Sequence, residues 1–154
     1  MSIKKGTEFK LYYSASALAD VQNGTVQGAT WTEATNVSSA NPTSSREDNT
    51  VTIRLGGGTE VGLGGKVTNE ISFSVPYDPD DGFYDALATA YDADSVIALA
   101  DMDGEISTTG SKGVVGNFNI KEFSRDEPDS GAAVTTVRAR PTSVFARNYE
   151  ASAV

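Results

Sequence analysis

A single helical segment set between strand-like segments is the feature that most constrains how this chain can fold. The stretch 71–100 opens with apolar residues at every second position, Ile71, Phe73 and Val75, which is the alternation of a half-buried strand. Pro76 ends that strand, and the apolar residues then change to helical spacing before a second apolar run closes the stretch. Because so short a helix is marginally stable alone, it must pack on a sheet built from its neighbours.

The predicted helix covers about Gly82–Tyr91. The apolar residues that recur over this range lie on one face of about three turns, and they are Phe83, Leu87, Ala90 and Tyr91. We expect Phe83, Leu87 and Tyr91 to fix the helix on the flank of the sheet.

Three aspartates, Asp78, Asp80 and Asp81, stand just before this helix. Carboxylates at that place accept hydrogen bonds from free backbone N–H groups and meet the positive end of the helix dipole. The cluster has some likeness to a calcium loop, but the glycine that belongs at the sixth position of such a loop is the fifth residue here, Gly82. Helix capping is the preferred explanation, and weak ion binding stays open.

The composition excludes several kinds of chemistry. The 154 residues predict one domain, 1–154, and a domain of this size buries roughly 70% of the surface that its unfolded chain exposes. There is no cysteine, which excludes disulfides and thiolate metal sites, and no histidine, the usual general base at neutral pH. We therefore expect no cofactor, no metal site and no enzyme; paired carboxylates are the weakest of the alternatives.

The charge balance argues against a surface that grips nucleic acid. Twelve basic and 21 acidic residues give a formal charge of −9, whereas a phosphate-binding surface needs the opposite sign. A surface along which DNA passes without sticking would carry this sign. The N-terminus lacks the apolar run of a secretory signal, and no stretch approaches the about 20 apolar residues of a membrane span, so no membrane association is expected.

The N-terminal part of the sequence predicts two strands and a turn. Phe9, Leu11 and Tyr13 alternate with other residues as in a strand, and Asn23-Gly24 is a hairpin-type turn signal. A second strand follows and contains Trp31, the only tryptophan. We expect Trp31 in the core or at a sheet edge rather than stacked on a ligand.

A long polar excursion comes next. The segment 38–50 contains no large apolar residue, so it is predicted to be an exposed loop. Val51, Ile53 and Leu55 then alternate as a strand, and a glycine-rich run leads back toward the central strand. Residues 38–67 thus form an extended loop or hairpin, which is either functional or disordered, since loops of this length are uncommon inside compact domains.

The segment after the helix predicts a further hairpin. Asp103-Gly104 is its turn signal, and alternation resumes over 116–123. Phe123 arrives one residue late in that alternation, which indicates a bulge or the end of the strand.

The C-terminal part predicts one strand and an ambiguous tail. The strand covers 134–140 and ends before Pro141, whereas 142–154 is either a final strand or an arm that docks on a neighbouring copy. The cationic residues in this part would pair with acidic groups of a neighbouring copy or, equally, of the same chain, and they are Arg138, Arg140 and Arg147.

The order of these features resembles the major tail tube proteins of long-tailed bacteriophages. The resemblance covers roughly Phe9–Ser143 and is carried by the segment Trp31–Val37, the polar and glycine-rich excursion, the strand and turn ISFSVPYDPDD, the helix FYDALATAYD and the closing VTTVRARPTS. That family is similar in fold to the tube proteins of type VI secretion and of contractile tails.

The resemblance implies a mainly β, sandwich or barrel-like domain with one flanking helix. It implies a homo-oligomer in which six copies form a ring and rings stack into a hollow tube, with DNA passing through the lumen without specific binding. The excursion 38–67 would reach an adjacent ring. It also implies a place in the virion tail after assembly in the host cytoplasm, with tape measure, tail terminator and distal tail or baseplate proteins as partners.

The residues expected at interfaces between copies are the charged ones of the excursion and the C-terminal part: Arg46, Glu47, Asp48, Arg54, Glu60, Lys66, Arg138, Arg140 and Arg147. Two other functions stay open. One is a β-sandwich adhesin or carbohydrate-binding module with Trp31 and the tyrosines as a sugar platform. The other is a tail terminator or capsid-decorating protein, which would form a ring but no long tube.

Overall fold

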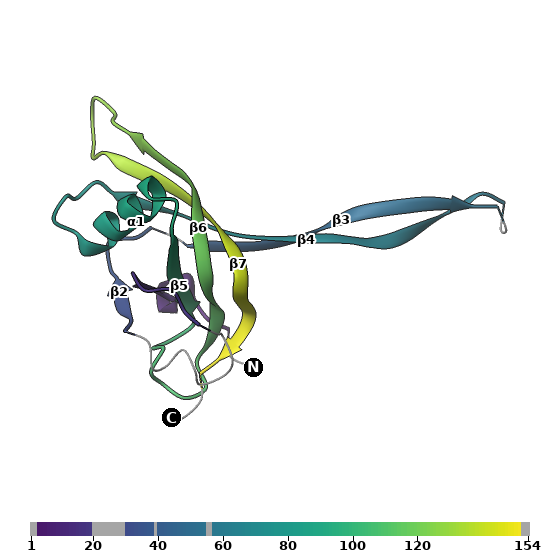
Figure 1. Cartoon of the computed structure of the whole chain (residues 1–154), viewed down its shortest axis with the longest axis horizontal. Helices are drawn as coiled ribbons and strands as arrows, with labels where there is room; N and C mark the ends of the chain where they lie inside the picture. Colours follow the sequence, from purple (N-terminus) through teal and green to yellow (C-terminus); the bar gives the residue numbers. More distant parts are fainter. Residues whose placement is uncertain (1–2, 20–29, 39, 55–56, 152–154) are drawn as a thin grey trace.

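Seven antiparallel strands and one α-helix make up the described part of the chain (Figure 1). A computed structural model describes residues 3–19, 30–38, 40–54 and 57–151. In the sheet the strands follow the order β2-β1-β5-β6-β7-β4-β3. In chain order the elements are the 3-10 turn η1 (Gly6–Glu8), β1 (Lys10–Ser14), β2 (Thr32–Ala34), β3 (Asn41–Ile53), β4 (Thr59–Pro76), α1 (Gly82–Asp92), β5 (Val96–Met102), β6 (Lys112–Asp126) and β7 (Val134–Glu150).

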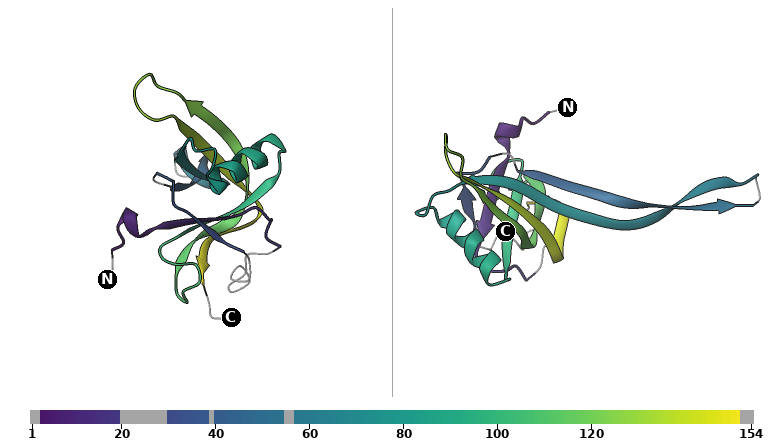
Figure 2. Two further views of the ribbon diagram at one scale, coloured as in Figure 1. Left: turned by 90° about the vertical axis from the view of Figure 1, so that its left-hand side faces the viewer. Right: turned by 90° about the horizontal axis from the view of Figure 1, so that it is seen from above.

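The sheet curls strongly, so that strands far apart in its order share one core (Figure 2). Leu11 of β1 and Ala34 of β2 belong to the same buried cluster as Phe73 and Val75 of β4, although three strands separate β1 from β4 in the sheet. The expectation of a mainly β, sandwich or barrel-like domain with one helix is confirmed. Of the two forms, the barrel-like one describes the hydrogen bonding better, because a continuous ladder joins every described strand.

Helix α1 lies across the concave face of the curled sheet near β5 and β6. Its N-cap is Asp81, whose side chain accepts a hydrogen bond from the backbone N–H of Phe83 at 3.3 Å. The helix continues one residue beyond the predicted end. The residues that it buries share the side facing the sheet, and they are Phe83, Tyr84, Leu87 and Ala90.

Of the three residues expected to pack α1 on the sheet, Phe83 and Leu87 are fully buried, whereas Tyr91 packs only in part. Tyr91 is 44% exposed, and its ring stacks on that of Phe123 at a centroid distance of 5.9 Å. Tyr84 takes the buried place instead, with its ring against Phe123 at 5.4 Å.

The segment 38–50 is not a loop. Its residues from Asn41 onward belong to β3, which pairs with β4 from Asn41↔Ser72 to Ile53↔Thr59. Every residue of β3 is exposed, so neither face needs apolar side chains, and no alternation marks the strand before Val51. Backbone pairing with β4 stabilises it instead. Residues 20–29, with the predicted Asn23-Gly24 turn, lie outside the described residues.

Strands β6 and β7 are both longer than predicted. β6 begins at Lys112, four residues before the expected start, and β7 continues through Pro141 to Glu150. Pro141 is tolerated because the β6–β7 register shifts between Gly116 and Phe118, so the missing N–H falls at an irregularity. The bulge predicted near Phe123 is confirmed by a further register shift between Ile120 and Glu122.

A second, smaller core covers the opposite face of the sheet at the end away from α1. It is formed by Tyr12, Ala100, Met102, Ile106, Val115, Tyr149 and Ala151, and Trp31 packs against it. Trp31 is thus part of a core edge, as expected. No helix in the described part of the chain is long and apolar enough to cross a membrane.

Replacing Leu87 by alanine is expected to destabilise the free subunit by about 2–5 kcal/mol, because Leu87 is fully buried and its removal leaves a cavity between α1 and the sheet. Urea unfolding followed by circular dichroism measures the change. Thr89→Ala, on the exposed side of the same helix, should change stability by about 0.5 kcal/mol or less. A loss below about 1 kcal/mol for Leu87→Ala would contradict this packing.

Candidate functional site

A long two-stranded hairpin, β3 with the first part of β4, projects from the curled sheet (Figures 1 and 2). β4 pairs with β7 only from Ile71 to Pro76, and its preceding residues pair with β3 alone. β3 is 13 residues long, so at about 3.3 Å per residue its far end lies about 40 Å from its start. An isolated two-stranded ribbon of this length is marginally stable in water, which favours contact with another molecule.

One face of the hairpin's outer half is apolar. Val51, Ile53 and Leu63 are 45%, 41% and 53% exposed, and Leu63 lies directly opposite Asn49, which shares the face of Val51 and Ile53. The other face is polar, and there Thr50 hydrogen-bonds to Glu60 at 3.1 Å. Apolar side chains gathered on one side of a solvated ribbon mark an interaction surface.

A charged cluster lies where the hairpin leaves the sheet. Nε and Nη2 of Arg138 donate to the two carboxylate oxygens of Glu70 at 2.9 and 3.3 Å. Arg140 approaches the same carboxylate at 3.6 Å, and Glu122 approaches Arg138 at 3.6 Å. The hydrogen bonds from Arg138 lower the pKa of Glu70 below its usual value. The cluster ties β4, β6 and β7 together at the last rung of the β4–β7 ladder, Ile71↔Ala139.

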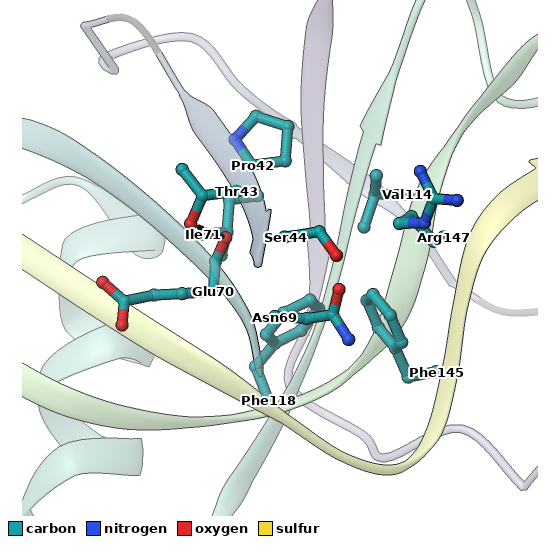
Figure 3. A pocket seen from close by; sticks show the side chains of 10 residues that line it. All are labelled: Pro42, Thr43, Ser44, Asn69, Glu70, Ile71, Val114, Phe118, Phe145 and Arg147. Carbon is teal, nitrogen blue, oxygen red and sulfur yellow. Dashed lines mark hydrogen bonds between the residues drawn. The ribbon is translucent and has the colours of Figure 1, made fainter. Parts of the chain in front are cut away.

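A small cavity of about 270 Å³ opens beside this cluster (Figure 3). Its apolar wall includes Ile71, Phe118 and Phe145, and the last two rings meet edge to face at 5.9 Å. Asn69 and Arg147 supply polar groups, and the Oδ1 atom of Asn69 is buried without a hydrogen-bond partner among the described residues. The cavity exists because β4 diverges from β7 and leaves the second half of β7 paired only with β6.

A larger open groove of about 1010 Å³ lies between the two outer strands of the sheet. Phe9 and Leu11 line it from the β1 side, and Asn41 and Pro42 line it from the start of β3. Asp101 of β5 also lines the groove, yet this side chain is only 6% exposed. Within the described chain its carboxylate has no hydrogen bond or ion pair, and burial raises its pKa from 3.8 to about 6.

The predicted interface residues divide into two groups. Those of the excursion all lie exposed on the hairpin or at its turn, and they are Arg46, Glu47, Asp48, Arg54, Glu60 and Lys66. Arg46 also donates to the backbone carbonyl of Gly65 at 3.0 Å, which stabilises the ribbon across a register shift. Arg138 and Arg140 instead pair within the chain, so the intramolecular alternative describes them, whereas Arg147 is exposed on β7 at the small cavity.

The aspartates before α1 act on the backbone. Asp81 caps the helix, and Asp78 accepts a hydrogen bond from the N–H of Asp80 at 3.0 Å. In the described ranges, no group of three or more acidic or other metal-ligating residues could hold an ion.

Sequence reasoning missed Asp101 and the apolar face of the hairpin. Ile97 and Leu99 face the core, and Asp101 follows at the next alternate position of β5. This spacing indicates that the side chain of Asp101 points to the same buried face. The alternation of Val51 and Ile53 predicts a strand, but it does not show that both side chains are exposed.

The fold matches those of solved tail structures. The sequence matches no protein-family model and no curated protein. Over 94% of this chain and 98% of the other, it is similar to a chain in the tail of an empty gene transfer agent particle refined with C6 symmetry, with 15% identity and a TM-score of 0.68. A chain from the virion of a native gene transfer agent particle has the same coverage, 16% identity and a TM-score of 0.66.

A third similar structure is the SPP1 tail tube, solved by solid-state NMR and cryo-electron microscopy. The match has 12% identity and a TM-score of 0.69, and covers 97% of this chain and 81% of the other. The chain thus has the tail tube fold that the sequence resemblance implied.

Replacing Asp101 by asparagine is expected to stabilise the free subunit above pH 6. The folded-state pKa is raised, so the wild-type carboxyl is most favourable below pH 3.8, and stability falls as pH rises toward 6. The change from 3.8 to about 6 corresponds to at most about 3 kcal/mol. Urea unfolding from pH 4 to 8 measures it: the two proteins should converge at pH 4, and equal stability at pH 8 would contradict the burial of this charge.

Proposed function

We propose that this chain is the structural subunit of a phage-type tail tube, in which rings of six copies stack into a hollow conduit for DNA. The observation that carries the proposal is the projecting hairpin with an apolar face that the rest of its own subunit leaves uncovered. It belongs to a fold whose solved examples include a C6-symmetric tail and the SPP1 tail tube. The role is structural and includes no catalytic step.

The hairpin supports the stacking part of this proposal. A ribbon of about 40 Å is long enough to cross from one subunit to the next ring, and its exposed charged residues would meet complementary groups there. The free edge of β7 beyond Ala139 offers backbone groups to a strand of a neighbouring copy in the same ring.

The charge of the chain supports the conduit part. A formal charge of −9 disfavours binding of the phosphate backbone, so DNA would slide rather than stick. In this role the protein lies in the virion tail after assembly in the host cytoplasm. Its further partners would be a tape measure protein, a tail terminator and distal tail or baseplate proteins.

The purified protein is expected to form six-fold rings or tubes at high concentration, visible by negative-stain electron microscopy. A protein that stays monomeric under all assembly conditions would contradict the proposed function. Rings that never stack would favour the terminator or capsid-decorating alternative.

Shortening the hairpin separates stacking from folding. Ser45 and Thr68 face each other in the β3–β4 ladder, so an Asn-Gly turn can replace residues 46–67. Because every residue of β3 is exposed, the shortened protein should keep its thermal transition but form no tubes. Loss of folding in circular dichroism would contradict an assembly role for the hairpin, and so would unchanged tubes.

A further inference from the structure

The open groove holds a buried negative charge that the described chain does not neutralise. Asp101 is the charge, and the cationic residues that line the groove are Lys5 and Lys10. Lys10 is engaged by Glu33 at 3.4 Å and by Glu105 at 3.9 Å, and Lys5 forms no ion pair with Asp101. A buried carboxylate without a partner destabilises the subunit, so its presence in an accessible groove points to a cationic ligand.

The walls of the groove favour an extended segment with mixed side chains. The groove lies between the edge strand β2 and the start of β3, and both have backbone groups that no other described strand pairs. Phe9, Leu11 and Val37 make the walls partly apolar, and Phe9 is 44% exposed. A fitting ligand therefore carries apolar side chains next to a cation on a long stem.

The hairpin turn of this chain carries that combination. Arg54 lies at the turn directly after Val51 and Ile53, and no hydrogen bond or ion pair holds it in the described structure. Arginine suits a partly buried pair because its guanidinium is always charged and is weakly hydrated. β3 starts at the groove and ends about 40 Å away, so Arg54 is far from Asp101 of its own subunit.

We propose that the groove is the receptor for the hairpin of a second copy, with Arg54 of the incoming hairpin paired to Asp101 and its apolar face against Phe9 and Val37. This proposal rests on the proposed tube function. The contact between Arg54 and Asp101 would make the stacking of rings specific. In this arrangement the buried charge of Asp101 destabilises the free subunit, and its ion pair with Arg54 stabilises the assembly. Its charge would favour hairpins of the same kind over unrelated apolar segments.

Cysteine crosslinking tests the proposed contact in assembled protein, because the native chain has no cysteine. Thr52→Cys places a thiol beside Arg54, and Thr35→Cys places one on the groove, while Arg54 and Asp101 stay in place. Mixed assemblies treated with a short bis-maleimide should give a crosslinked dimer on denaturing gels. Thr52→Cys mixed with Asp129→Cys, in the turn between β6 and β7, is the matched control and should give none.

A double-mutant cycle tests whether Arg54 and Asp101 interact directly across the interface. Asp101→Asn and Arg54→Gln should each raise the critical concentration for assembly by about tenfold or more, and the double variant should raise it no further than either single change. Arg54→Lys should recover part of the loss. Wild-type assembly should weaken by up to about tenfold per pH unit below pH 6, and Asp101→Asn should lack that dependence.

Three results overturn the pairing while leaving the tube function intact, and the first two are these. One is wild-type tubes without the Thr35–Thr52 crosslink, and the other is single-variant losses that multiply in the double variant. A crosslink of equal yield in the Asp129 control would overturn it as well. Failure of the wild-type protein to form any ring or tube overturns the proposed function itself.

Discussion

The structure depends on a change of partner within β4. Ile71, Phe73 and Val75 are buried, and β4 pairs with β7 from Ile71 to Pro76. It pairs with both β3 and β7 only at Ile71 and Ser72, whereas the residues before Ile71 pair with β3 alone. The cause is apolar burial, since Ile71, Phe73 and Val75 gain the core's hydrophobic stabilisation and the preceding segment has little to bury there. One strand thereby serves two structures, a curled sheet and a projecting ribbon.

The point at Ile71 where β4 separates from β7, which we call the fork, accounts for three neighbouring features. The second half of β7 is left with a free edge, the cavity beside Phe145 opens, and the buried amide oxygen of Asn69 lacks a partner. The cluster of Glu70 with Arg138 and Arg140 crosses the fork and fixes how β4 leaves the sheet. Because these groups are partly exposed, their effect on stability is small, and orientation of the hairpin is their main consequence.

Stability and function are divided between the two ends of the curled sheet. At one end α1 covers the concave face with Phe83 and Leu87 and leaves little to bind. At the other end the groove stays open and holds Asp101, whose buried charge destabilises the free subunit. Under the proposed pairing, a second copy that fills this groove neutralises the charge of Asp101, so assembly removes a destabilising feature of the free subunit.

The sequence by itself determined the β class, the single helix, its aspartate cap and the polar character of the excursion, because alternation, helical spacing and capping are local properties. It could not determine that residues 41–50 belong to the same strand as Val51 and Ile53, since a polar ribbon exposed on both faces has no alternation to detect. Only the tertiary structure decided that Arg138 and Arg140 pair with Glu70, 68 residues away from Arg138 in sequence. It also decided that Asp101 is buried, because burial depends on which strands meet across the groove.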